Sequence, residues 1–253
     1  MSDINVTLVP CLTDNYAYLV SNRSGVCAVV DPSEPEPVRK ALSEHGLKLT
    51  HILNTHHHLD HCGGNLALKD EFGAQVIGPA KDRERIPGID VGVAEDTPWV
   101  FGSQKVRILE IPAHTRGHIA FVFDDFAFTG DTLFAMGCGR LFEGTPAMMW
   151  SSLSKLMRLS DETKIYCGHE YTLSNGRFAL TMEPSNRDLQ ARMRDIQRLR
   201  DNDQPTIPST IGLEKKTNPF LRPDSPQIRA TLDMRDADDV AVFGEIRKRK
   251  DSF

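Results

Sequence analysis

Residues 55–61 read Thr-His-His-His-Leu-Asp-His and hold four candidate metal ligands: His56, His58, Asp60 and His61. In an extended backbone alternate side chains point the same way, so we expect His56, His58 and Asp60 to converge and His57 to face away. Imidazole and carboxylate ligands suit zinc, iron or manganese, whereas calcium prefers oxygens and structural zinc sites usually include cysteines. The stretch therefore predicts a catalytic metal site.

The sequence around this stretch predicts a mixed α/β domain. Strands are expected at residues 6–9, 16–20, 26–30, 49–54, 106–111, 118–123, 126–129 and 164–167, and helices at residues 37–45, 65–72 and 147–159. The candidate ligands then lie in a loop between a strand and a helix.

Strand signals fade after about Tyr171, and apolar residues recur at helical spacing in the charged stretch that follows, at Leu189, Met193, Ile196 and Leu199. We therefore predict a domain with the metal site at residues 1–171 and a smaller helical domain at residues 172–253. Residues 204–223 contain four prolines and Gly212, which favours an ordered surface connection over a helix.

The chain has 253 residues, of which 40% are hydrophobic, enough for a full core. We expect neither an N-terminal targeting signal nor a membrane span, because no apolar run approaches the roughly 20 residues required. Five scattered cysteines, an odd number without a Cys-x-x-Cys pair, favour a reduced, cytoplasmic compartment. The net charge of -5 disfavours nucleic acid as a partner, although residues 187–251 are mildly basic, with 14 Lys/Arg against 12 Asp/Glu.

Three later segments supply further donors beside a glycine or at a strand end: His114, Asp131 and His169. We expect one metal ion to be held by His56, His58 and His114. A second ion would be held by Asp60, His61 and His169, with Asp131 bridging both ions. Two ions that share a hydroxide supply a nucleophile, so no protein nucleophile is needed, and we interpret Cys62 and Cys138 as packing residues.

The order of these segments resembles the metallo-β-lactamase superfamily, whose signature is Thr-His-x-His-x-Asp-His followed by separated His, Asp and His ligands. Three details resemble the glyoxalase II, or hydroxyacylglutathione hydrolase, family: residues 130–134 leading into residues 137–140, the segment 168–172, and a terminal Arg247-x-x-Lys250-Asp251. The β-lactamases themselves resemble the chain less, because they typically carry cysteine where Asp131 stands.

The resemblance implies an αββα sandwich of the metallo-β-lactamase type followed by a helical glutathione-binding domain. It implies hydrolysis of the thioester S-D-lactoylglutathione to D-lactate and glutathione, the step that completes methylglyoxal detoxification. Asp60 and Asp131 would act with a metal-bridging hydroxide, and two divalent ions per chain are expected, zinc first, with iron and manganese as alternatives. The substrate contacts implied are Arg140, Phe142, Tyr171, Arg247 and Lys250. The family often carries lysine and tyrosine where this chain has Arg140 and Phe142.

Several alternatives stay open at this point. Asp31 either orients a ligand or simply closes an Asp-Pro turn, and His118 is either a hydrogen-bonding partner of the site or, less favoured, a ligand. The run 247–250 suits a helix end, a nucleic-acid contact or the substrate. We expect a small-molecule substrate (acylated glutathione), no nucleic-acid or membrane partner, and a monomer. The rival functions are another hydrolase of the fold, acting on a different thioester, a lactone or a phosphoester, and an RNA-binding or processing module.

Overall fold

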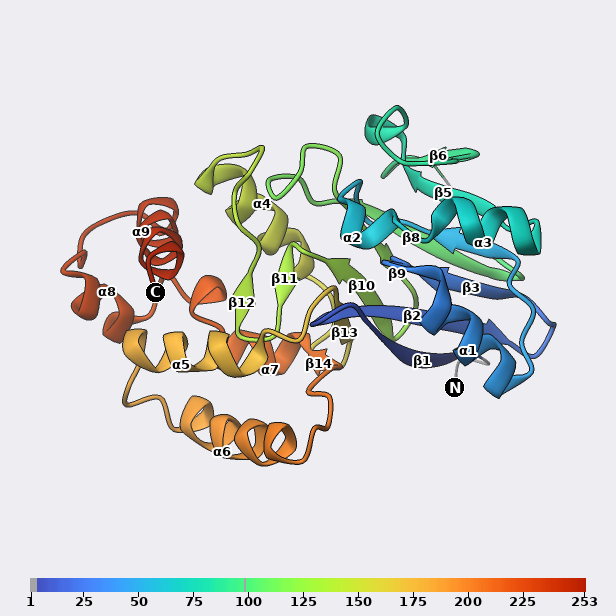
Figure 1. The fold of residues 1–253 in the computed structure, drawn as a ribbon. Coiled ribbons are helices and arrows are strands. Elements are labelled where there is room, and N and C mark those ends of the chain that lie inside the picture. Colours follow the sequence, from blue (N-terminus) through green and yellow to red (C-terminus); the bar gives the residue numbers. More distant parts are fainter. Residues whose placement is uncertain (1–3, 98) are drawn as a thin grey trace. The chain divides into compact units, whose positions relative to one another are not determined.

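The computed structural model describes residues 4–97 and 99–253 (Figure 1). Residues 1–3 lie outside the described residues. They belong to the N-terminal segment in which we expect no targeting signal. The chain divides into two compact units. The first unit runs to Glu110 and includes Thr115–Gly130, and the second consists of Ile111–His114 and Asp131–Phe253.

A six-stranded sheet of the first unit has its strands in sequence order: β1 (Ile4–Cys11), β2 (Asn15–Asn22), β3 (Cys27–Val30), β4 (His51–Leu53), β5 (Gln75–Pro79) and β6 (Val91–Val93). Strands β1 to β3 pair antiparallel, whereas β3 to β6 pair parallel. Parallel neighbours need a crossover connection. The helical crossovers are α1 (Pro35–His45), α2 (Leu59–Cys62), α3 (Asn65–Phe72) and the 3-10 helix η1 (Ala80–Asp82).

The core of this unit lies between the sheet and its helices. Val38 and Leu42 of α1 pack with Leu68 of α3 and with strand residues such as Val29 and Ile52. A second group of strands in the same unit pairs antiparallel in sequence order: β7 (Trp99–Phe101), β8 (Gln104–Glu110), β9 (Ile119–Val122) and β10 (Phe126–Gly130). In each group, a strand leads into a loop with candidate ligands: β4 in the first group, and β8 and β10 in the second.

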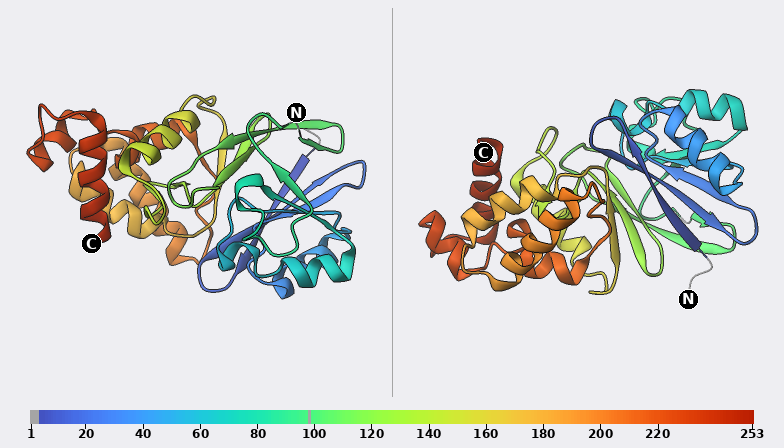
Figure 2. Two further views of the ribbon diagram at one scale, coloured as in Figure 1. Left: turned by 90° about the horizontal axis from the view of Figure 1, so that it is seen from above. Right: turned by 60° about the horizontal axis from the view of Figure 1, so that its bottom comes forward.

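The second unit is mainly helical (Figure 2). Its strands are the hairpin β11 (Leu133–Phe134) with β12 (Gly137–Cys138), and the pair β13 (Lys164–Cys167) with β14 (Ser209–Thr210). Its helices are α4 (Pro146–Leu156), α5 (Thr172–Met182), α6 (Arg187–Asp201), α7 (Ile211–Thr217), the 3-10 helix η2 (Pro219–Leu221), α8 (Pro226–Leu232) and α9 (Asp239–Asp251). Helices α5 and α6 pack around Met136, Ala179, Leu189 and Ile196.

The expectation of a non-helical connection at 204–223 is wrong, because α7 and η2 lie within it. Thr210 caps α7 by accepting from the backbone N–H of Leu213, and Pro219 stands at the start of η2, where proline is tolerated. Gly212 lies against Asp161. Caps and close packing thus outweigh the breaker residues that the sequence displays.

Glu214 of α7 is fully buried and organises the polar interior of the second unit. Its carboxylate accepts from the backbone N–H of Met136 at 2.7 Å, from Nη2 of Arg192 at 2.6 Å and from Nδ2 of Asn218 at 3.0 Å. A buried carboxylate is tolerated only when it is paired and hydrogen-bonded in this way. Glu214 therefore ties the β11–β12 hairpin to the C-terminal helices.

All five cysteines are buried and form no disulfide. Burial raises the thiol pKa to about 11 for Cys11, Cys27 and Cys138, and to about 12 for Cys62 and Cys167. Across the described residues, every helix is too short or too polar to cross a lipid bilayer.

Candidate metal centre

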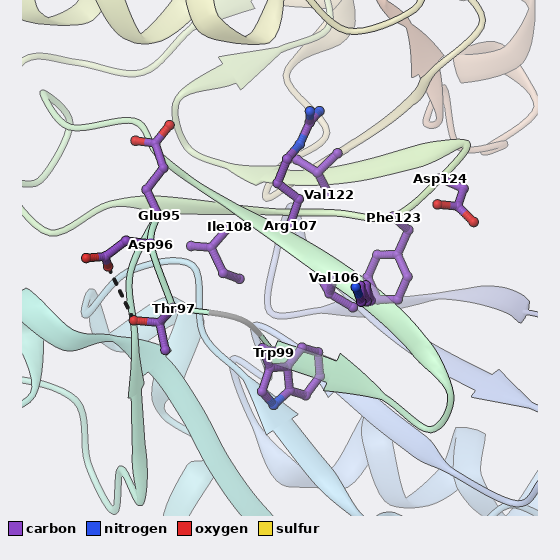
Figure 3. Close-up of a pocket in the computed structure, with 11 residues that line it drawn as sticks. Glu95, Asp96, Thr97, Trp99, Val106, Arg107, Ile108, Val122, Phe123 and Asp124 are labelled. Atoms are coloured by element: carbon purple, nitrogen blue, oxygen red, sulfur yellow. Dashed lines mark hydrogen bonds between the residues drawn. The ribbon is translucent and has the colours of Figure 1, made fainter.

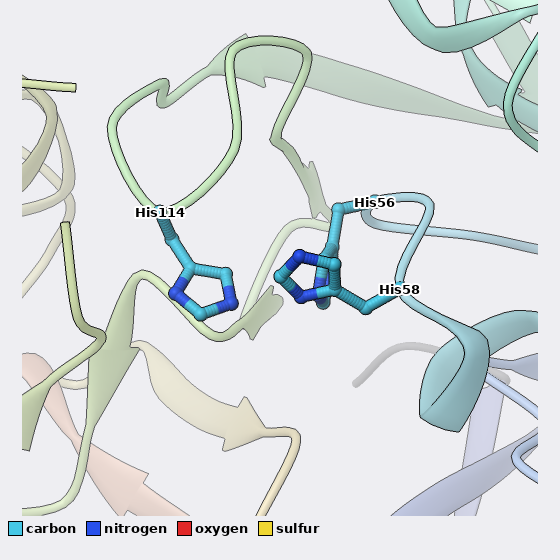
Figure 4. A group of neighbouring side chains, drawn as sticks. All are labelled: His56, His58 and His114. Carbon is cyan, nitrogen blue, oxygen red and sulfur yellow. The ribbon is translucent and has the colours of Figure 1, made fainter. Parts of the chain in front are cut away.

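The first unit carries four candidate ligands directly after β4. His56 and His58 stand on the loop, whereas Asp60 and His61 belong to α2, so the expected extended alternation through Asp60 is wrong. The turn of α2 starts at Leu59 and brings Nε2 of His61 to 3.6 Å from Oδ2 of Asp60. Nε2 of His56 lies 3.1 Å from Nδ1 of His58 (Figure 4). This loop therefore presents two imidazole nitrogens side by side.

Asp31, directly after β3, holds the ligand-bearing segment that follows β4 through hydrogen bonds. Its carboxylate accepts from the Thr55 N–H at 2.8 Å, from the Thr55 hydroxyl at 2.6 Å and from Nδ1 of His61 at 3.1 Å. Because the Thr55 hydroxyl donates to Asp31, it can accept from Nδ1 of His56, 3.0 Å away. Both His56 and His61 thus hold their protons on Nδ1 and direct the Nε2 lone pair outward, so Asp31 orients ligands and does more than close a turn.

The second unit carries the remaining candidate ligands, His114 after β8, Asp131 after β10 and His169 after β13. Oδ2 of Asp131 lies 3.2 Å from Nε2 of His169 and 3.6 Å from Nε2 of His114. Nδ1 of His114 donates to the Arg140 carbonyl at 2.9 Å, which again leaves Nε2 as the ligand atom. One carboxylate oxygen therefore stands between two imidazole nitrogens.

Both sets of donors suit a transition-metal ion. Two ligand atoms bound to one tetrahedral zinc at about 2.0–2.1 Å lie roughly 3.3 Å apart. The His56–His58 separation of 3.1 Å and the Asp131–His169 separation of 3.2 Å both match this value. The donors are only imidazoles and carboxylates, which is the ligand set of a catalytic ion rather than of a structural zinc.

Two aromatic side chains of the second unit lie on its candidate ligands. The Tyr171 ring stacks on His169, with centroids 4.6 Å apart and planes 3° apart. The Phe142 ring lies 5.1 Å from that of His114. Phe142 is 61% exposed and Tyr171 37%, so both offer an apolar surface beside the ligands to an entering molecule. These are two of the five side chains expected to contact substrate.

The other three expected substrate contacts are cations grouped around Asp251, at the end of α9. Arg247 Nη2 lies 2.9 Å and Arg140 Nε 3.9 Å from the Asp251 carboxylate. Burial lowers the pKa of Lys250 below its usual 10.5, and the charges of Arg247 and Arg140 lower it further. The positive charges of Arg247 and Arg140 thus add to that of Lys250, and a group of cations favours an anion.

Arg247 has a structural task that the sequence did not reveal. Its side chain is 5% exposed, lies over the Phe220 ring and donates from Nη1 to the Cys138 carbonyl at 2.8 Å. Lys250 is more accessible and contacts the Ser174 hydroxyl at 3.4 Å. Within the expected pair, Lys250 is therefore the better placed to meet a ligand.

The other histidines and the cysteine near the site, which were not assigned as ligands, have contacts of their own. His57 Nδ1 lies 3.2 Å from Asp82, and His118 donates to the Ile119 carbonyl while its ring stacks on His56. The Cys62 thiol donates to the backbone carbonyls of His57 and His58, and its raised pKa makes it a poor nucleophile. His118 thus supports the site by packing.

A separate cavity of about 520 Å³ lies over β7 to β9, lined by Trp99, Ile108, Phe123 and eight neighbours (Figure 3). None of the expected site residues is among them. This cavity is therefore separate from the ligand-bearing loops.

Comparison with known proteins agrees with this chemistry. The model of the Metallo-beta-lactamase superfamily matches residues 12–169, which defines the class of the fold and of the site. The fold prediction is confirmed by the crystal structure of ETHE1 from Myxococcus xanthus, with a TM-score of 0.70, 24% identity, and coverage of 96% of this chain and 90% of that one. A crystal structure of a protein in a di-iron-bound form is 26% identical, with a TM-score of 0.62, and covers 84% and 98% of the two chains.

A second model, Hydroxyacylglutathione hydrolase C-terminus, matches residues 170–253. Hydroxyacylglutathione hydrolase of Methylococcus capsulatus is 51% identical over 253 residues, which cover 99% of each chain. The chain belongs to the hydroxyacylglutathione hydrolase family, and it is a metal-dependent hydrolase.

Three features of the site were not anticipated from the sequence. The Thr55 hydroxyl links Asp31 to His56, and Gly139 lies where a Cβ would overlap the Asp131 carbonyl. Buried Asp82 contacts the metal loop from η1. Thr55 and Gly139 stand inside the motifs, but no sequence signal connects Asp82 with them.

Proposed function

We propose that the chain hydrolyses the thioester of acylated glutathione, with S-D-lactoylglutathione as the substrate and D-lactate and glutathione as the products. Water adds to the thioester carbonyl carbon, the C–S bond breaks, and the sulfur leaves with its electron pair and is protonated to the glutathione thiol. The relatives that share half of the sequence over the full length carry this activity in their name.

We propose two divalent ions per chain, held by seven residues: His56, His58, Asp60, His61, His114, Asp131 and His169. Such ions would supply a Lewis acid for the carbonyl and a bound water of lowered pKa. The di-iron form of the 26% identical protein supports the number of two. Zinc is our first assignment, and iron or manganese would suit the same donors.

The residues of the chain itself position the reaction. Asp31 and the Arg140 carbonyl fix the proton positions of three ligand imidazoles, so that each directs Nε2 outward. Phe142 and Tyr171 would contact the acyl and thioester part of the substrate with their apolar rings. Arg140 and Lys250 would bind a glutathione carboxylate. The expected boundary between a catalytic domain (1–171) and a substrate-binding domain (172–253) remains part of the proposal.

One observation carries this assignment. Within the second unit, three features occur together: the bridging candidate Asp131 with two imidazoles, an exposed aromatic ring beside each of those imidazoles, and the cations around Asp251. A metal-activated carbonyl site beside an anion-binding group fits a thioester whose carrier bears carboxylates. A simple lactone or phosphoester would need only the first of these features.

The contacts of the basic run 247–250 count against the RNA-binding alternative. In the basic run 247–250, Arg247 is buried, and Lys248 and Arg249 both pair with Glu245, at 3.8 and 3.1 Å. The run therefore does not present four cations along one face to a phosphate backbone. We also propose that the protein is cytoplasmic, since its five thiols are buried and form no disulfide. A monomer remains part of the proposal.

The test is metal analysis and substrate turnover on the same preparation. We expect about two ions per chain and rapid hydrolysis of S-D-lactoylglutathione, lost on chelation and restored by zinc. A generic phosphodiester and a β-lactam serve as competing substrates. Faster turnover of either one, or full activity in the metal-free protein, would refute the proposal.

A further inference from the structure

We propose that Asp82, in η1 outside the ligand set, is a positioning residue that holds the metal-binding loop in its ligating shape. The inference rests on the proposed metal site and adds a residue that neither the motif nor the family match assigns a role. It comes from a buried carboxylate whose surroundings all belong to the first unit.

Asp82 is 1% exposed, an unusual position for a carboxylate unless it is paired. Arg85, one turn further on, donates to Oδ1 from Nη2 at 2.5 Å and from Nε at 3.2 Å. The backbone supports the same turn, since the Asp82 carbonyl accepts from the N–H groups of Arg85 and Ile86. The carboxylate is thus fixed in place and keeps Oδ2 for another partner.

That partner is His57, whose Nδ1 donates to Oδ2 at 3.2 Å. His57 stands between the candidate ligands His56 and His58, so a fixed His57 ring restrains the backbone that carries both ligands. A hydrogen bond to a buried, immobile acceptor restricts this ring more than contact with solvent would. Asp82 therefore acts on both ligands through the residue between them.

The same carboxylate also packs against a second ligand-bearing segment. A Cβ at Gly117 would overlap all three carboxyl atoms of Asp82, so the backbone of the segment after His114 lies directly on this group. Gly117 has no positive φ, so the need for glycine there is contact with Asp82 and not backbone conformation. One buried side chain therefore supports the loops that follow β4 and β8.

The experiment measures zinc retention rather than turnover. Wild-type protein and variants are loaded with zinc, the ions per chain are counted, and the rate of transfer to an excess of a chromogenic chelator is followed. We expect Asp82→Asn to release zinc about tenfold faster, the lower range for residues that orient ligands. Asp90→Asn is the matched control, because Asp90 also pairs with a cation, Lys69 at 2.5 Å, but does not bond to His57.

Two further variants keep the test decisive if Asp82→Asn folds poorly. Gly117→Ala should displace the carboxylate and accelerate zinc release similarly. His57→Gln should do the same, and its combination with Asp82→Asn should be no faster than the quicker single variant, because both act through one contact.

Wild-type release rates in Asp82→Asn, equal acceleration in Asp90→Asn, or additive effects in the double variant would overturn the inference. A wild-type protein that holds no zinc would instead refute the proposed metal site itself. Asp82→Asn also removes the buried charge that pairs with Arg85 and should lower the unfolding temperature, so release is measured well below the unfolding temperature of every variant. Faster release from protein that is fully folded there separates loop positioning from a general loss of stability.

Discussion

Oδ2 of Asp131 lies 3.2 Å from Nε2 of His169, a separation that suits two ligands of one ion. Replacing the carboxylate removes the oxygen donor that lies between two imidazoles of the second unit's candidate site. We expect Asp131→Ala to lower turnover of S-D-lactoylglutathione by about a thousandfold or more and to reduce the bound metal to about one ion per chain. Elemental analysis and steady-state kinetics measure both, and circular dichroism should show a retained fold.

Asp31 accepts three hydrogen bonds in a buried position, and an amide cannot replace it, because its nitrogen would face other donors. We expect Asp31→Asn to lower the free energy of unfolding of the metal-free protein by about 2 kcal/mol. Urea denaturation measures this quantity. The same change at exposed Asp96 should have little effect, and a wild-type midpoint for Asp31→Asn would contradict the role assigned to it.

Lys250 is the more accessible cation of the α9 pair Arg247 and Lys250. Lys250→Met keeps an unbranched side chain but removes the ammonium group, which lies over the Phe178 and Phe253 rings. KM for the glutathione thioester should therefore rise about fivefold or more while kcat changes little. Lys248, exposed on the same helix and paired with Glu245, supplies the control variant Lys248→Met. A small thioester without carboxylates should not distinguish the variants, and an equal loss with both substrates would contradict a role in glutathione recognition.

Arg247 should behave differently from Lys250 because it donates to a buried carbonyl. Arg247→Met leaves the Cys138 carbonyl without this donor and should lower the free energy of unfolding by about 2 kcal/mol. A shift in KM without any loss of stability would show that the arginine serves the substrate alone. Chemical denaturation and kinetics on the same sample decide between the two.

Glu183 makes stability depend on pH. Burial alone would raise its pKa, but hydrogen bonds from Arg222 and Ser225 outweigh burial and hold the pKa below the usual 4.5. A carboxyl with a lowered folded-state pKa stabilises the protein above pH 4.5 and loses this contribution as the pH falls through the folded-state value. Glu183→Gln should therefore cost about 2 kcal/mol at pH 7 and flatten the decline of unfolding free energy in acid.

The sequence predicted the regular elements well where periodicity and breakers agree. The strand expected at 164–167 and the helix expected at 65–72 match β13 and α3 residue for residue. The sequence-based prediction failed where tertiary contacts determine the secondary structure. An example is α7, whose glycine packs against Asp161. The prediction also missed β5 and β6, short strands that contain glycine and take their conformation from parallel pairing.

The candidate ligands followed from spacing, but the means of holding them did not. The motif names His56, yet the proton on its Nδ1 depends on Thr55 and on Asp31, 24 residues before Thr55. Asp82 meets His57 across 25 residues, and a distance of this kind leaves no periodic trace in a single sequence. Residues that orient ligands are chosen by the folded backbone, so only coordinates reveal them.

The five buried thiols also determine how the protein can be modified chemically. Maleimide reagents need an accessible thiolate, and burial with raised pKa values denies them one at every native position. A cysteine introduced at an exposed site such as Lys248 would therefore be the sole reactive handle for a fluorophore or spin label. The wild-type chain already serves as the unlabelled background for distance measurements between the two units.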